Sequence, residues 1–183
     1  MKTINNELIR SFHPCYDPSE MDIPDNETLP VLEWVEKYRG VVPAKDIVWL
    51  LCRNEFMSVR DLRLFAVWCT REALKLIEHP DARSIEACNV AERFANGDAT
   101  MEEMEAARDA ALDAWDDAMA ASWDASDNAV SAMAAAMAAS RDDAWDAWDA
   151  LDVWDDARDV WAALDVWDDA REAQLNKLLT YFK

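Results

Sequence analysis

Apolar residues recur every three to four positions through the middle of the chain, which is the spacing of one face of an α-helix. Between residues 58 and 80 one such face is formed by Leu62, Phe65, Cys69, Ala73 and Leu76. Ser58 and Asp61 form an N-cap pair before it, and His79-Pro80 ends it. The pattern therefore predicts a helix between these two signals.

Further helices are predicted on both sides of this one. One covers residues 30–39 and closes at Gly40, another begins at Pro43, and a third covers about residues 84–95. Together they predict a small helical domain over residues 29–97. Three prolines among Asp, Asn and Ser indicate an irregular N-terminal arm over residues 1–28.

A long amphipathic helix is predicted after Gly97, over about residues 101–139. Thr100 and Glu103 form a capping box at its start. Counted from Met104, one narrow face between about 20° and 80° carries large apolar residues. They are Leu112, Trp115, Met119, Val130, Met133 and Met137. The opposite face is acidic and carries Asp109, Asp113, Asp116, Asp117, Asp124 and Asp127.

The segment that follows contains an identical repeat. The nine residues at 150–158, ALDVWDDAR, recur at 163–171, so the period is 13 residues. On a straight helix this period leaves the two copies about 140° apart, so their tryptophans point in different directions. The last 86 residues contain no Gly or Pro, which predicts helix throughout.

The fold class is therefore all-α: a small helical domain followed by an Ala-rich region over residues 98–183. Ser140 and Asp143 could cap a new helix. We therefore expect a break near Ser140 that folds this region into an antiparallel helical hairpin. One continuous helix over residues 101–180 is the alternative.

Charge narrows the range of partners. The 183 residues carry a formal net charge of −20, and residues 101–183 hold 21 acidic side chains against 6 basic ones. Such a balance disfavours direct binding to nucleic acid or to an anionic membrane and favours a basic protein partner. A toxin, a nuclease or a nucleic-acid-binding protein fits this description. The alternative is a solvated acidic face produced by expansion of the repeat.

Catalysis, cofactors and metals find no support in the sequence. No nucleotide-binding or hydrolase motif occurs, and His13 and His79 are the only histidines. The four cysteines form no C-x-x-C pair, so we expect Cys52, Cys69 and Cys88 to be reduced core thiols. With no signal peptide and no membrane span recognised, a cytoplasmic location is expected.

Two sequence blocks resemble a family of bacterial and phage proteins that are usually labelled immunity proteins. The blocks are DLRLFAVWCTREAL at residues 61–74 and SIEACNVAERFANG at residues 84–97, and the similarity continues through TMEEMEAARDAA at 100–111. The resemblance covers about residues 55–175 and implies an all-α protein that binds and neutralises another protein without catalysis. Tails of this type often alternate Ala with Arg, whereas Asp dominates in this chain.

The leading hypothesis is a non-enzymatic acidic protein that blocks a basic surface of another macromolecule, as an immunity protein or a phage-type inhibitor of a host defence or nucleic-acid-binding protein would. Nucleic-acid mimicry is one way in which it could do so. Aspartates would supply the negative electrostatic field that attracts the partner, and tryptophans would supply the apolar contacts that anchor it. The proposed residues are Asp149, Asp152, Asp155, Asp156, Asp159, Asp168, Asp169, Trp154, Trp161 and Trp167. Two alternatives stay open: a self-assembling helical protein whose tryptophans are homo-oligomer contacts, and a small-molecule sponge that holds ligands between indoles and carboxylates.

Overall fold

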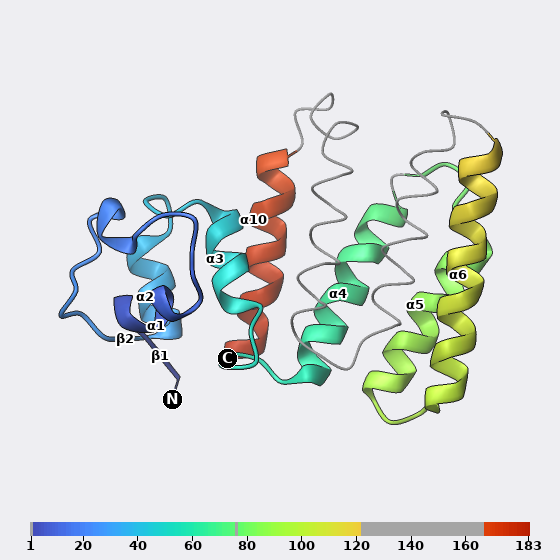
Figure 1. Cartoon of the computed structure of the whole chain (residues 1–183), viewed down its shortest axis with the longest axis horizontal. Helices are drawn as coiled ribbons and strands as arrows, with labels where there is room; N and C mark the ends of the chain where they lie inside the picture. Colours follow the sequence, from blue (N-terminus) through green and yellow to red (C-terminus); the bar gives the residue numbers. More distant parts are fainter. Residues whose placement is uncertain (1, 76, 122–166) are drawn as a thin grey trace. The chain divides into compact units, whose positions relative to one another are not determined.

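The computed structural model describes residues 2–75, 77–121 and 167–183, with the backbone alone for residues 118–121 and 167–169. The described residues are mostly helical, with one two-stranded sheet, in agreement with the all-α expectation (Figure 1). They form two compact units, Met1–Phe56 with Asp168–Lys183, and Met57–Trp167. The predicted hairpin and its break near Ser140 lie outside the described residues.

Both ends of the chain contribute to the first unit. Its elements are β1 (Thr3–Ile4), α1 (Asn6–Ser11), the 3-10 helix η1 (Pro18–Met21), β2 (Leu29–Pro30), α2 (Val31–Tyr38), α3 (Ala44–Leu51), α10 (Trp167–Leu178) and the 3-10 helix η3 (Leu179–Phe182). The two strands are antiparallel, with Ile4 opposite Leu29. The predicted helices after Pro30 and Pro43 are confirmed as α2 and α3, and Gly40 ends α2 with a φ of 90°.

Within residues 2–28, where the sequence predicted an irregular arm, the structure contains β1 and the short helices α1 and η1. The polar residues taken as signs of irregularity cap short helices instead. Asn5 caps α1 by accepting a hydrogen bond from the Leu8 N–H at 2.8 Å, and Asp17 caps η1 in a capping box with Glu20.

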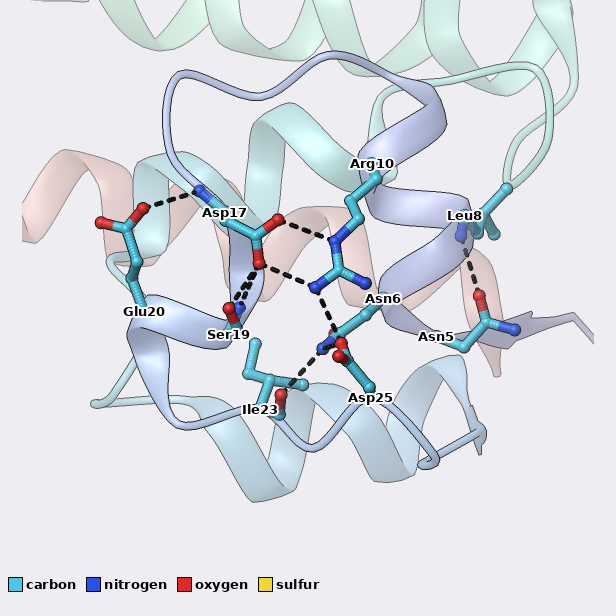
Figure 2. A network of polar contacts seen from close by, with 9 residues as sticks. All are labelled: Asn5, Asn6, Leu8, Arg10, Asp17, Ser19, Glu20, Ile23 and Asp25. Carbon is cyan, nitrogen blue, oxygen red and sulfur yellow. Dashed lines mark hydrogen bonds and ion pairs between the residues drawn. The ribbon is translucent and has the colours of Figure 1, made fainter.

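A polar network ties α1 to the segment that follows it (Figure 2). The Arg10 guanidinium donates to both carboxylate oxygens of Asp17, at 2.7 and 2.8 Å, and approaches Asp25 Oδ1 at 2.8 Å. The buried Asn6 amide donates to the Ile23 carbonyl at 2.8 Å and to Asp25 Oδ1 at 3.0 Å. Donation from Arg10 lowers the pKa of Asp17, and donation from Asn6 and then Arg10 lowers that of Asp25.

This network predicts a loss of stability in acid. Because both carboxyl pKa values are lower in the folded chain, the stabilisation is fully present above the ordinary Asp pKa of about 4. It falls as the pH drops through that value towards the lowered ones. We expect Arg10→Gln to reduce stability near neutral pH and to flatten the decline below about pH 4. Urea midpoints measured against pH check this, and parallel curves for the two proteins would contradict it.

The second unit contains three helices, α4 (Val59–Leu74), α5 (Ala82–Ala95) and α6 (Met101–Ala121). The predicted cap of α4 is confirmed, because the Asp61 N–H donates to Ser58 Oγ at 3.1 Å. The helix ends at Leu74, before the predicted stop at His79-Pro80. Beyond Leu74 the Ile77 N–H donates to the Leu74 carbonyl at 3.3 Å, a turn in place of a further helical bond. Of the predicted face of α4, Leu62, Phe65, Cys69 and Ala73 are buried, and Leu76 lies outside the described residues.

The three helices share one hydrophobic cluster, formed by Ala66, Val67, Leu74, Ala87, Cys88, Val90, Ala91, Met104 and Ala111. On α6 the fully buried side chains are Met104, Ala111 and Ala114, whereas Leu112 and Trp115 are only half-buried. The predicted seam therefore reaches the contact at Leu112, which packs against the cluster beside the fully buried Met104 and Ala111. Alanine on both helices allows their backbones to approach closely. The other seam positions lie beyond the described side chains.

Three of the four cysteines are core thiols, as expected. Cys52, Cys69 and Cys88 are buried and unbridged, and Cys15 is exposed. Burial raises the pKa of Cys52 to about 12 and that of Cys88 to about 11, so both stay protonated at neutral pH. In the part of the chain that the structure describes, no helix is long and apolar enough to span a bilayer.

Candidate acidic interaction surface

The described part of the acidic tail presents one carboxylate-bearing face to solvent. Asp109, Asp113, Asp116 and Asp117 on α6 are all exposed, which confirms the predicted acidic side of this helix. Asp124 and Asp127 lie outside the described residues. Glu102 and Glu105 extend the same face towards the start of the helix. The acidic face of α6 is defined by Glu102, Glu105, Asp109, Asp113 and Asp116.

The orientation of this face follows from how α6 is held. Met104, Ala111 and Ala114 turn inwards, so residues about half a turn away point to solvent. At the start of the helix the Thr100 N–H donates to Glu103 Oε2 at 2.8 Å, and the Glu103 N–H donates to Thr100 Oγ1 at 3.2 Å. This capping box is as predicted, and the bond from the Thr100 N–H lowers the pKa of Glu103. The carboxylates therefore stand on a helix fixed at its start and along its buried side.

Part of the acidic charge is compensated locally. Arg108 pairs with its neighbour Asp109 at 2.7 Å, and Arg83 Nη1 pairs with Asp117 Oδ2 at 2.8 Å. Arg83 also contacts Asp81, the N-cap of α5, and these two carboxylates raise the pKa of Arg83. Arg83 thereby links α5 to α6.

The remaining carboxylates of the face stay uncompensated within the described residues. Glu102, Glu105, Asp113 and Asp116 make no ion pair with any described side chain. Their like charges repel one another along the helix, at a cost of about 0.2–0.5 kcal/mol for each pair three or four residues apart. A cationic surface brought against α6 would relieve this repulsion.

Most residues predicted to bind a partner lie outside the described residues. These are Asp149, Asp152, Asp155, Asp156, Asp159, Trp154 and Trp161. Trp167, Asp168 and Asp169 open α10, where the backbone alone is described. How these ten side chains are arranged relative to one another stays a prediction.

Sequence reasoning missed the link that Arg83 makes between α5 and α6. The residue stands two positions after an N-cap aspartate, which indicates a local contact and says nothing of the next helix. It also missed that basic side chains near α4 are already engaged: Arg71 pairs with Glu92 at 2.6 Å, and Arg60 donates to Asn96 Oδ1 at 2.6 Å.

The chemistry open to this face is electrostatic recognition. Over the described residues, no three His, Cys, Asp or Glu side chains are grouped so as to hold a metal ion. Solvent-exposed carboxylates on a rigid helix instead attract cationic groups and accept hydrogen bonds from them. Compared with known proteins, the chain matches no family model, no curated protein and no solved structure.

Proposed function

We propose that this protein is a non-enzymatic acidic binding protein that blocks a basic surface of another macromolecule in the cytoplasm. An immunity protein, or a phage-type inhibitor of a host defence or nucleic-acid-binding protein, would act in this way. The observation that carries the proposal is the acidic face of α6, where four carboxylates without a described ion-pair partner project from a helix packed on its other side.

The spacing of these carboxylates favours a protein surface as the target. The five carboxylates of the acidic face, from Glu102 to Asp116, span about 21 Å of helix, or one charge per ~5 Å. Duplex DNA carries one charge per ~1.7 Å. The charges of the acidic face are therefore sparser than those of a phosphate backbone. Their spacing is better matched to separate Lys and Arg side chains on the surface of a folded protein than to a groove that binds DNA.

The sequence after α6 extends the same chemistry. The seven aspartates of the candidate site, from Asp149 to Asp169, would add to the negative electrostatic field, and Trp154, Trp161 and Trp167 would anchor the partner. We propose that the expected helical hairpin presents them. Charge would then set the rate of encounter, and the indoles would slow dissociation.

The test is capture from host lysate with the tagged full-length chain at low salt, followed by elution at high salt and mass spectrometry. We expect a basic nuclease, toxin or nucleic-acid-binding protein to be released by salt. Replacing the seven aspartates of the candidate site by asparagine should lower the association rate with that partner by about 10- to 1,000-fold. Asp113→Asn with Asp116→Asn tests the described face in the same assay.

The matched control replaces the same aspartates by glutamate, which keeps the charge and should keep the binding. Circular dichroism of each variant verifies that the helices are retained. Unchanged association of the asparagine variant would contradict the proposal. Recovery of the bait alone, as a salt-insensitive complex, would favour self-assembly through tryptophan contacts instead.

A further inference from the structure

The turn that joins α5 to α6 contains the one Asn-Gly pair of the sequence (Figure 1). The chain has two glycines, of which Gly40 follows Arg39 and Gly97 follows Asn96. Asn96 and Gly97 are both exposed, and Gly97 has a φ of 83°. In an Asn-Gly pair the next backbone nitrogen reaches the side-chain amide most easily, because glycine has no Cβ to hinder the approach. The pair is therefore a candidate site of chemical modification.

The side chain of Asn96 is held at both of its polar atoms. Its Nδ2 donates to the Glu92 carbonyl at 3.0 Å, at the end of α5. Its Oδ1 accepts a hydrogen bond of 2.6 Å from Nη2 of Arg60, which belongs to α4 and also contacts Asp61 at 3.1 Å. Because an arginine guanidinium stays charged at neutral pH, a positive charge lies directly against the amide carbonyl of Asn96.

Arg60 stands where negative charge develops when this amide is attacked. As the Gly97 nitrogen adds to Asn96 Cγ, the carbonyl oxygen becomes an oxyanion. A donor already in place stabilises that oxyanion more than it stabilises the neutral amide. Asn26 and Asn54 are also exposed, but glutamate follows each of them, and its Cβ hinders the same attack. Asn96 thus combines the favourable neighbour in sequence with a cationic donor on its carbonyl.

The backbone has to move before the attack can occur. Asn96 has a helical ψ of −4°, and the Gly97 N–H donates to the Phe94 carbonyl at 3.0 Å. In this conformation the nitrogen is held in the last turn of α5. Hydrogen bonds at an exposed helix end open locally far more often than those in a core. The fold therefore slows the reaction without preventing it.

We propose that Asn96 is a site of spontaneous deamidation and that Arg60 assists the reaction. The Gly97 nitrogen loses its proton and forms a bond to Asn96 Cγ. The bond from Cγ to Nδ2 breaks, and Nδ2 takes up a proton and leaves as ammonia. Water then opens the resulting succinimide ring at either carbonyl and yields aspartate or isoaspartate. The modification is independent of the proposed function, since it needs only the chain and water.

Deamidation would change both the charge and the backbone at this junction. Either product replaces a neutral amide by a carboxylate beside Arg60, and a carboxylate cannot donate to the Glu92 carbonyl. Isoaspartate also adds a methylene group to the main chain. It does so within the turn that the Asp98 N–H closes by donating to the Arg93 carbonyl at 2.8 Å. The connection between α5 and α6 would thus be altered in protein that has aged.

Incubation of the full-length chain in mildly alkaline buffer, followed by peptide mapping with mass spectrometry, tests the site. Fragmentation that cleaves the Cα–Cβ bond of isoaspartate distinguishes the two acidic products. We expect acidic forms of Asn96 to accumulate at least about tenfold faster than those of Asn26 and Asn54. These two asparagines are controls within the same sample.

Arg60→Gln tests the assistance by the guanidinium. Its removal should slow deamidation at Asn96 by about three- to tenfold, less than the loss of a buried oxyanion donor because Arg60 is exposed to solvent. Lys75→Gln, which removes a positive charge at the other end of α4, is the control and should leave the rate within about twofold. Hydrogen exchange of the amides of residues 92–97 measures how often the turn opens in each variant, and the deamidation rates are corrected for it.

Equal rates at Asn96 and at the two control asparagines would overturn the proposal. A corrected rate in Arg60→Gln that equals or exceeds that of the wild type would overturn the role of Arg60 and show that this side chain only holds the amide in place. Because no partner takes part in these measurements, failure to capture a basic protein would count against the proposed function alone.

Discussion

Replacing Ala111 by aspartate is expected to lower the free energy of unfolding of the three-helix unit by about 3–5 kcal/mol. Ala111 has no exposed surface and belongs to the cluster shared by α4, α5 and α6. A carboxylate there would enter a contact made of small apolar side chains and would lose its hydration without gaining a cation. The helix would have to separate from α5 to keep that charge in water.

The control is the same substitution at an exposed position of the same helix. Ala106 faces solvent, so Ala106→Asp should cost no more than about 0.5–1 kcal/mol, from helix propensity and added like charge. Urea unfolding followed by circular dichroism compares the two variants. Equal losses would mean that the alanine stripe is not the packed side of α6. Unequal losses would show that an aspartate on the buried side of α6 destabilises the fold, whereas an aspartate on the exposed side is tolerated.

The sequence predicted the helix ends well because their causes are local. Ser58 and Asp61, Thr100 and Glu103, and Gly40 each act on backbone groups within three or four residues. Such contacts depend on no other part of the fold. The same reasoning underestimated residues 1–28, where Asn5 and Asp17 also act as caps but each helix is too short to show an apolar period.

The packed side of α6 was predicted less well, because periodicity favours large residues. Leu112 and Trp115 dominate any apolar face drawn on this helix, yet both are only half-buried, and the fully buried side chains are Met104, Ala111 and Ala114. Leu112 packs against the cluster from its edge. The residues of α5 that face α6 determine which side chains of α6 become buried. Ala87 and Ala91 have no exposed surface on α5, so small residues on α6 allow a closer approach than indole or leucine would.

Contacts between distant segments could not be predicted from the sequence. Arg39 contacts Glu172 and Asn176 of α10, and no local signal connects residues so far apart in the sequence. The link from Arg83 to Asp117 is of the same kind. Of the candidate site, the sequence correctly predicted the acidic face of α6, since exposure there follows from helix geometry and charge.

Trp34→Ala is expected to have the largest effect in the N-terminal unit, a loss of about 3–5 kcal/mol in the free energy of unfolding. Trp34 is 2% exposed, and its ring lies 5.1 Å from that of Tyr38, centroid to centroid. Truncation to alanine removes the largest fully buried side chain of the described residues and leaves a cavity beside Tyr38. Urea unfolding followed by circular dichroism measures the loss, and hydrogen exchange in α2 and α3 locates it.

Trp34→Phe separates the two ways in which this side chain acts. The indole N–H is buried and has no acceptor among the described residues, so its polar group opposes folding while its rings favour it. Phenylalanine keeps an aromatic ring against Tyr38 and removes that donor, so it should retain at least about 2 kcal/mol of what alanine loses. If phenylalanine and alanine cost the same, the indole N–H must be hydrogen-bonded in solution, and the ring contact with Tyr38 would not be the source of the stability. A loss under about 1 kcal/mol for Trp34→Ala would contradict the central place of Trp34 in this core.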